Sequence, residues 1–173
     1  MIKLINGRGQ LGDAMKKHLR NVSFYKKIKK NLNREVLLYH TWIFEDKSKI
    51  KQKQQFQKFI SFIEKNKEKH IVFTSTYSEK ENWYNHYKQL AEAFLISNCK
   101  SCLVIRIPTI IGKGICEKIK NSEVNVYGKM NLISLDKAAK EILNLCSYEG
   151  LIKSVTIQGE KIKAKTVKAL YSI

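Results

Sequence analysis

The chain has 173 residues, of which 43% are apolar, so it has the size and composition of one folded domain, residues 1–173, with a buried core. No apolar run is long enough for a membrane-spanning helix, and we expect no cationic, cleavable leader at the N-terminus. These features exclude a membrane-spanning protein and a disulfide-rich secreted scaffold, and we expect a cytoplasmic location.

The formal charge of +18 suggests a polyanionic partner, because clustered lysine and arginine bind phosphate backbones. The lysines are spread over segments such as KKIKK and KSKIKQKQQFQK, however, and no nucleic-acid motif accompanies them. Solvated helix faces account better for this pattern. Nucleic acid is therefore a disfavoured partner, whereas a small anionic substrate would be attracted.

The four cysteines lack the spacing of a disulfide framework, so we expect reduced thiols at Cys99, Cys102, Cys116 and Cys146. Only Cys99 and Cys102 form a C-x-x-C pair. A zinc site would need two further ligands nearby, and the flanking sequence reads as a helix end entering a buried strand. We therefore predict no metal.

Apolar periodicity predicts strands that alternate with helices. In chain order we expect a strand at 2–5, a helix at 12–20, strands at 22–25 and 35–40, a helix at 47–67, a strand at 70–76, a helix at 84–97, a strand at 102–112, a short strand at 124–128, a helix at 135–146, a strand at 154–159 and a helix at 164–171. This alternation predicts an α/β fold with a mostly parallel, doubly wound sheet.

A G-x-G-x-x-G pattern joins the first strand to the first helix. Gly7 permits a tight turn, Gly9 lets the backbone approach a pyrophosphate, and Gly12 lets the helix pack closely. The N-terminal amides of that helix would face the anion. A dinucleotide site is the favoured interpretation, and a tight turn that merely requires glycine is the alternative.

The acid that binds the ribose of NAD about twenty residues further on is missing. Tyr25, Lys26 and Lys27 stand there instead. Lys26, Lys27 or Arg8 would suit a 2′-phosphate, so the charge favours NADP, with NAD as the alternative.

Tyr84 and Lys88 form Y-x-x-x-K at the start of a predicted helix, one turn apart on the same face. An ammonium beside a phenol favours the phenolate, which would let Tyr84 exchange a proton with a carbonyl or hydroxyl. A chance pairing of a half-buried tyrosine with a solvated lysine is the alternative.

Taken in order, the segments NGRGQLG, LLYHTW, FTST, YNHYK, IRIPTIIGKG and LISLDKAAKEIL resemble the extended short-chain dehydrogenase/reductase family, and NGRGQLG most resembles its dTDP-4-dehydrorhamnose reductase branch. The resemblance implies a Rossmann-like fold, an NAD(P) cofactor and a sugar-nucleotide substrate. It implies catalytic roles for Thr76, Tyr84 and Lys88. It implies cofactor contacts for Gly7, Arg8, Gly9, Gln10, Leu11, Gly12 and His40.

The sequence also departs from this family. Too few residues lie between 25 and 35 for the family's third strand and its helix, so part of the adenine pocket would be missing. The loop between Thr76 and Tyr84 is short, and the C-terminal substrate region is much reduced.

Three functions remain open. The first is an NADP-dependent oxidoreductase or epimerase of a sugar nucleotide that serves surface polysaccharide synthesis. The second is a catalytically idle dinucleotide-binding module with a regulatory or scaffolding role, and the third is a basic nucleic-acid binder. By the same resemblance, the helices at 47–67 and 84–97 would form a homodimer face.

Overall fold

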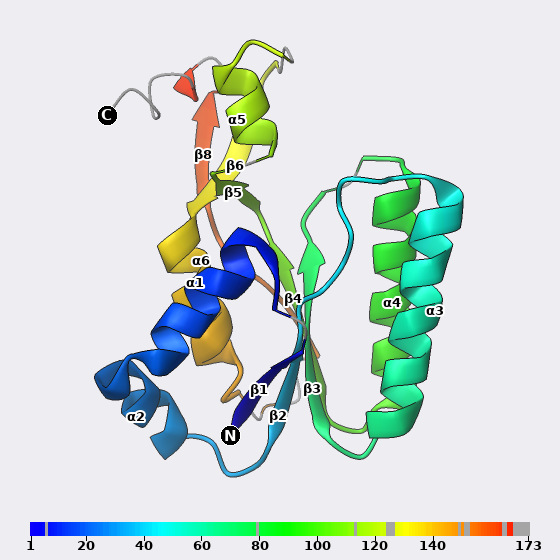
Figure 1. Cartoon of the computed structure of the whole chain (residues 1–173), viewed down its shortest axis with the longest axis vertical. Coiled ribbons are helices and arrows are strands. Elements are labelled where there is room, and N and C mark those ends of the chain that lie inside the picture. Colours follow the sequence, from blue (N-terminus) through cyan, green and yellow to red (C-terminus); the bar gives the residue numbers. More distant parts are fainter. Residues whose placement is uncertain are drawn as a thin grey trace.

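A computed structural model describes residues 1–5, 7–78, 80–112, 114–123, 127–148, 150, 153–163 and 166–167. Its centre is a sheet of five parallel strands (Figure 1). The spatial order is β1 (Ile2–Ile5), β2 (Val36–Tyr39), β3 (His70–Thr76), β4 (Cys102–Ile107) and β7 (Ser154–Thr156). The predicted α/β class and parallel sheet are therefore confirmed.

Helices cover both faces of this sheet, as Figure 1 shows. One face carries α1 (Gly9–Arg20), α2 (Val22–Lys30) and α6 (Leu135–Leu145). The other face carries α3 (Lys49–Asn66) and α4 (Trp83–Asn98), which lie side by side. The helices predicted at 47–67 and 84–97 are thus confirmed within two residues at each end.

Alternation along the strands divides the core into two clusters. In β2, Val36 and Leu38 pack toward α1 and α6, while Leu37 and Tyr39 pack toward α3 and α4. Because both faces are covered, all four residues are buried and the strand reads as a continuous apolar run.

A small second sheet extends from one end of the molecule (Figure 1). It contains β5 (Thr109–Ile111), β6 (Lys129–Ser134) and β8 (Glu160–Lys163), and its apolar side chains pack with those of α5 (Ile115–Lys120). β5 and β6 are parallel, whereas β6 and β8 are antiparallel. The strand predicted at 124–128 and the helix predicted at 164–171 lie largely outside the described residues.

The strand predicted at 22–25 is wrong, because this segment begins α2. The Asn21 side chain accepts a hydrogen bond from the Phe24 amide and caps the helix. Phe24 and Ile28, one turn apart, then pack against the core. A four-residue apolar run fits either structure, and the cap decides for a helix.

As a result, β1 lies at an edge of the sheet. In the doubly wound order 3-2-1-4-5-6 the first strand is central, but no strand of the described residues lies beyond β1 here. The chain passes from β1 to β2 over one face, and from β2 to β3 over the other, while stepping in one direction across the sheet. These two connections therefore have opposite hands, although parallel connections are normally all right-handed.

Candidate functional site

The register of the main sheet brings the predicted site residues to one edge. Ile5, Tyr39 and Phe73 pair across β1, β2 and β3. The glycine turn (residues 7–12), His40 and the end of β3 therefore follow at the same carboxyl edge. With strands about 4.8 Å apart, β1 and β3 are separated by about 10 Å.

The glycine turn has the close packing that its pattern predicts. A side chain at Gly12 would bring its Cβ within 2.5 Å of the Gly7 carbonyl carbon, so the helix and the turn touch through backbone alone. Gly9 has a φ of +77°, which favours glycine, and open space where a Cβ would point. No acidic residue occupies the first turn of α1, and Arg8 makes no side-chain cap. These features fit a bound pyrophosphate.

The side chains of the other predicted cofactor residues lie in different surroundings. Leu11 is buried in the core, whereas Gln10 Oε1 lies 2.5 Å from where a Cβ on Gly112, just after β5, would stand. Lys26 and Lys27 are exposed on α2, which starts where α1 ends. A helix of twelve residues is about 18 Å long, so α1 separates both lysines from the turn (Figure 1). The structure does not bring them to the predicted phosphate site.

Two asparagines hold the short loop that leads to Tyr84. Asn82 caps α4 by accepting from the Asn85 amide at 3.0 Å. The buried Asn85 donates through Nδ2 to Ser78 Oγ and to Lys80 O, at 3.1 and 2.6 Å. The first turn of α4 is thereby fixed next to the end of β3.

Lys88 lies beneath Tyr84 on the same face of α4. Its Nζ donates to Thr74 O at 2.7 Å and lies 5.9 Å from the centre of the Tyr84 ring. The ammonium also lies over Phe73 and Trp42, with Nζ 4.4 and 5.0 Å from their ring centres. Lys88 is only 3% exposed, so the predicted pair shares a face but is enclosed by aromatic rings.

Burial shifts both members of the pair toward their neutral forms. Burial raises the pKa of Tyr84 to about 12. Burial also lowers the pKa of Lys88 to about 7, although the charge of Glu92 acts in the opposite direction. In this closed structure Tyr84 is therefore a protonated phenol, suited to donate a proton, rather than the phenolate expected from the sequence.

His40 and Thr74 extend the cluster across the strands. His40 Nδ1 and Thr74 Oγ1 are 3.0 Å apart. Burial, with the charge of Lys88, lowers the pKa of His40 to about 4, so this imidazole is neutral near pH 7. Thr76, which carries the predicted catalytic hydroxyl, is the last residue of β3. Its Oγ1 accepts a hydrogen bond at 3.1 Å from the amide of Ser78 in the following loop.

A loop of residues 41–48 covers Tyr84 and Lys88. The ring of Phe44 meets the ring of Tyr84 edge-on at 5.6 Å, and Trp42 lies against Lys88. Gln52 of α3, which is fully buried, holds this loop down. It accepts from Trp42 Nε1 at 2.8 Å and donates through Nε2 to Ile43 O at 3.0 Å and to Asp46 O at 2.5 Å.

A partly buried ion pair lies one turn further along α4. Arg106 of β4 donates through Nε and Nη2 to Glu92 Oε2, at 3.0 and 2.6 Å. The side chain of Glu92 is 7% exposed, whereas that of Arg106 is 40% exposed. Glu92 follows Lys88 by four positions, so the two side chains share a helix face.

Sequence reasoning did not assign roles to Trp42, Phe44, Gln52, Glu92 or Arg106. The spacing of four residues between Lys88 and Glu92 could have indicated their common face. No sequence signal shows that a loop after β2 folds over α4.

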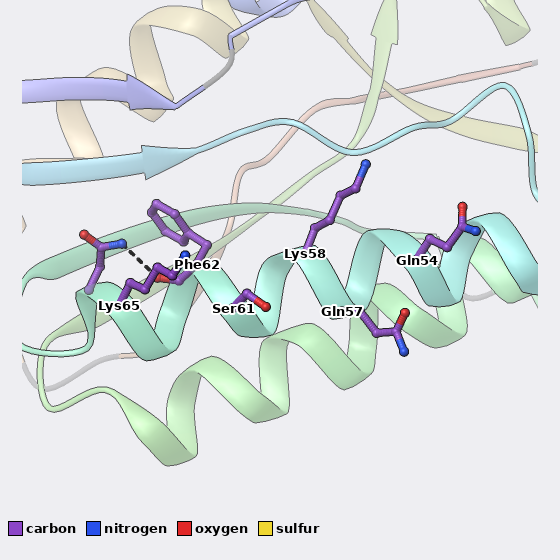
Figure 2. Close-up of a pocket in the computed structure, with 7 residues that line it drawn as sticks. Gln54, Gln57, Lys58, Ser61, Phe62 and Lys65 are labelled. Carbon is purple, nitrogen blue, oxygen red and sulfur yellow. Dashed lines mark hydrogen bonds between the residues drawn. The ribbon is translucent and has the colours of Figure 1, made fainter.

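A surface hollow of about 690 Å³ on α3 contains none of the predicted site residues. Figure 2 shows that its lining side chains project from α3 between Gln54 and Lys65. Asn66 Nδ2 donates a hydrogen bond to Phe62 O at the end of this helix. All four cysteines are buried free thiols. The described residues contain no cluster of metal-ligand side chains, and none of their helices is long and apolar enough to cross a membrane.

Comparison of sequences finds no matching family model and no matching curated protein. Comparison of structures finds close likenesses at low identity. The Bordetella bronchiseptica enzyme WbmG, solved with NAD, is 12% identical, with a TM-score of 0.72 over 99% of this chain and 78% of that chain. The dTDP-4-dehydrorhamnose reductase of Bacillus anthracis, solved with NADP, is 10% identical, with a TM-score of 0.68 over 99% and 81%.

The UDP-N-acetylglucosamine 4-epimerase of Bacillus cereus is also similar, with 15% identity and a TM-score of 0.63 over 97% of this chain and 81% of that chain. Identities this low show a shared fold. The fold expected from the sequence resemblance is thus confirmed: this chain has the Rossmann-like fold of these three enzymes and covers 78% to 81% of their chains.

Proposed function

We propose that this protein is an NADP-linked oxidoreductase or epimerase that acts on a sugar nucleotide, with NAD as the alternative cofactor. The observation that carries the proposal is the stacking of Tyr84 and Lys88 on one face of α4, at the same sheet edge as the glycine turn. The fold shared with sugar-nucleotide reductases and epimerases supports it. A role in surface polysaccharide synthesis and a cytoplasmic location are part of the same proposal.

The glycine turn would hold the cofactor by its pyrophosphate. The amides at the start of α1 would donate to the phosphate oxygens, and Gly9 leaves room for close approach. Arg8 is exposed next to these amides and would meet a 2′-phosphate. When bound, the nicotinamide would exchange hydride with a substrate carbon.

Tyr84 would supply the proton. Its phenol is kept neutral by burial and would donate to the substrate oxygen, while the Lys88 ammonium would stabilise the phenolate that remains. Thr76 Oγ1 already accepts from Ser78, and its hydroxyl hydrogen is left to donate to the same substrate oxygen. In the reverse direction the phenolate would take the proton back.

A catalytically idle dinucleotide-binding module is the second candidate, and two observations favour it. Phe44 and Trp42 cover the pair that would have to reach substrate. β1 also lies at the sheet edge, so the side where adenosine would bind lacks its strands among the described residues. Catalysis therefore requires the 41–48 loop to move, whereas the idle module does not.

Turnover and binding separate the two candidates. The protein would be titrated with NADPH and NADH, followed by cofactor fluorescence, and then incubated with a 4-keto sugar nucleotide. NADPH consumption by the wild type, lost in Tyr84→Phe, supports the enzyme. NADPH binding without consumption for any sugar nucleotide supports the idle module. Absence of binding removes both.

A homodimer formed through α3 and α4 remains part of the proposal. Ile50, Trp83 and Leu90 are large apolar residues on these helices with exposures of 70%, 41% and 39%. Burying such side chains would stabilise a dimer. Sedimentation equilibrium tests it, because a monomer at high concentration would remove this interface.

A further inference from the structure

The cation that the proposed chemistry depends on is buried where a cation is costly. Lys88 has one backbone acceptor, Thr74 O, and otherwise meets the rings of Trp42, Phe73 and Tyr84. One carbonyl and three ring faces replace only part of the lost hydration of an ammonium. Some other group must keep the proton on Nζ if Lys88 is to act as a cation near pH 7.

The charged and titratable groups around Lys88 can be followed element by element. His40 faces it from the end of β2 and is neutral, since its pKa is lowered to about 4. Tyr84, on the same helix, is neutral with a pKa of about 12. Arg106 from β4 is cationic and is bound to Glu92. Glu92 is therefore the one anionic neighbour among the described residues that pack around Lys88.

The geometry of Glu92 suits it to act through Lys88 rather than on substrate. It is 5% exposed and lies one helical turn below Lys88, farther from Tyr84. Two hydrogen bonds from Arg106 to one oxygen, Oε2, fix the carboxylate from the neighbouring strand. Arg106 also pairs with Ser75 in the sheet. Ser75 follows Thr74, whose carbonyl oxygen accepts the hydrogen bond from Lys88 Nζ.

We propose that Glu92 is a positioning residue, fixed by Arg106, that keeps Lys88 protonated beneath Tyr84. The inference rests on the proposed function only in one respect, namely that the Lys88 ammonium stabilises the Tyr84 phenolate during catalysis. The ionisation itself is a property of the folded chain and needs neither cofactor nor substrate. Without the Glu92 charge, burial alone acts on Lys88 and favours the neutral amine.

The test is a direct titration of Lys88. Protein labelled with ¹³C-lysine would be titrated by NMR through the Cε resonance, with Lys88→Met used to assign the signal. We expect the wild-type midpoint near pH 7. In Glu92→Gln the midpoint should fall by at least about one pH unit, a tenfold loss of proton affinity. Glu64→Gln, an exposed change on α3, is the matched control and should leave the midpoint unchanged.

Glu92→Asp keeps the charge but withdraws it by one methylene, and should give a smaller fall even if Glu92→Gln does not fold. In an active enzyme, Glu92→Gln should also lower kcat near pH 7 more than it raises KM. An unchanged Lys88 midpoint in Glu92→Asp or Glu92→Gln overturns the proposal, even if the enzyme is active. Failure to find turnover overturns the proposed function and leaves the titration result standing.

Discussion

Gly12 is the position in the glycine turn where a side chain would meet backbone atoms. An alanine Cβ there would lie 2.5 Å from the carbonyl carbon and 2.6 Å from the carbonyl oxygen of Gly7, and backbone atoms yield little. Although alanine favours a helix, we expect Gly12→Ala to lower the free energy of unfolding by about 2 kcal/mol, because α1 must shift. Urea denaturation measures the loss.

Gly9→Ala is the matched variant. It meets no atom within 4 Å but strains a φ of +77°, so a smaller loss of about 1 kcal/mol is expected. Equal stability of Gly12→Ala and wild type would show that α1 does not rest on the turn backbone.

In the proposed mechanism, proton transfer depends on Tyr84. Tyr84→Phe removes the phenol oxygen and keeps the ring that packs against Phe44. We expect turnover to fall by about a hundredfold to ten-thousandfold, the usual contribution of a general acid, with NADPH affinity nearly unchanged. Steady-state kinetics and a cofactor titration on the same preparations give both values. Equal turnover of variant and wild type would contradict the role.

His40 makes stability depend on pH. Its pKa is about 4 in the folded chain against 6.5 for the free group, so the unfolded chain binds a proton in this window and the folded chain does not. Free energy of unfolding therefore falls as pH drops from 6.5 to 4. The wild type should lose on the order of 3 kcal/mol more than His40→Asn between pH 7 and pH 4, by urea denaturation.

The asparagine side chain in His40→Asn would keep a polar partner for Thr74, so the variant isolates the titration. Asp46 and Asp136, whose pKa values are also lowered, act equally in both proteins. Parallel stability curves for the two proteins would mean that folding does not lower the pKa of His40.

Elements were predictable where their pattern was long. Phe59 and Ile63 continue an apolar stripe along α3, and β3 is a seven-residue buried run, so both were identified from the sequence. The segment at 22–25 failed because four residues cannot separate the two periods, and the side chain that decides, Asn21, acts by capping. β8 is strongly polar and pairs with β6 alone, so it has no apolar run to find.

The 41–48 loop is the element that packs against Tyr84, through the ring of Phe44. Gln52 holds it through Trp42 Nε1 and two loop carbonyls. Gln52→Met has similar volume and none of these hydrogen bonds. Amides of residues 41–48 should exchange with deuterium at least about tenfold faster, since each lost buried bond costs roughly 1 kcal/mol or more.

Gln57→Met is the control, because Gln57 is exposed on the same helix and lines the hollow of Figure 2. Exchange mass spectrometry resolves the loop peptide in both variants. Unchanged protection in Gln52→Met would show that aromatic packing alone holds the loop closed.

At the scale of the whole molecule, the sequence predicts the motifs of the candidate site but not the loop that encloses Lys88. Motif spacing located the glycine turn and the pair of Tyr84 and Lys88, and the parallel register brings both to one edge. The depth of Lys88 depends on Trp42, which arrives from a loop without periodicity. The sequence predicted that the family's third strand is missing, but it did not predict the loss of the second, because the segment that forms α2 was taken for a strand.

The open edge at β1 has a consequence for cofactor binding. In a doubly wound sheet the adenosine half lies on the side of strands 2 and 3, and here the described residues place no strand there. The glycine turn and the cluster around Lys88, which would hold the pyrophosphate and the nicotinamide half, are retained. Binding energy should therefore come mainly from that half.

We expect reduced nicotinamide mononucleotide to bind less than about tenfold more weakly than NADPH, a difference under 1.4 kcal/mol. Lys26 and Lys27 lie beyond the far end of α1, so Lys26→Ala with Lys27→Ala should leave NADPH affinity unchanged. Calorimetric titration with both ligands measures these differences at one salt concentration. A loss above a hundredfold with the mononucleotide would mean that adenosine finds its own pocket. If the double variant then also weakens NADPH alone, α2 forms that pocket by moving toward the turn.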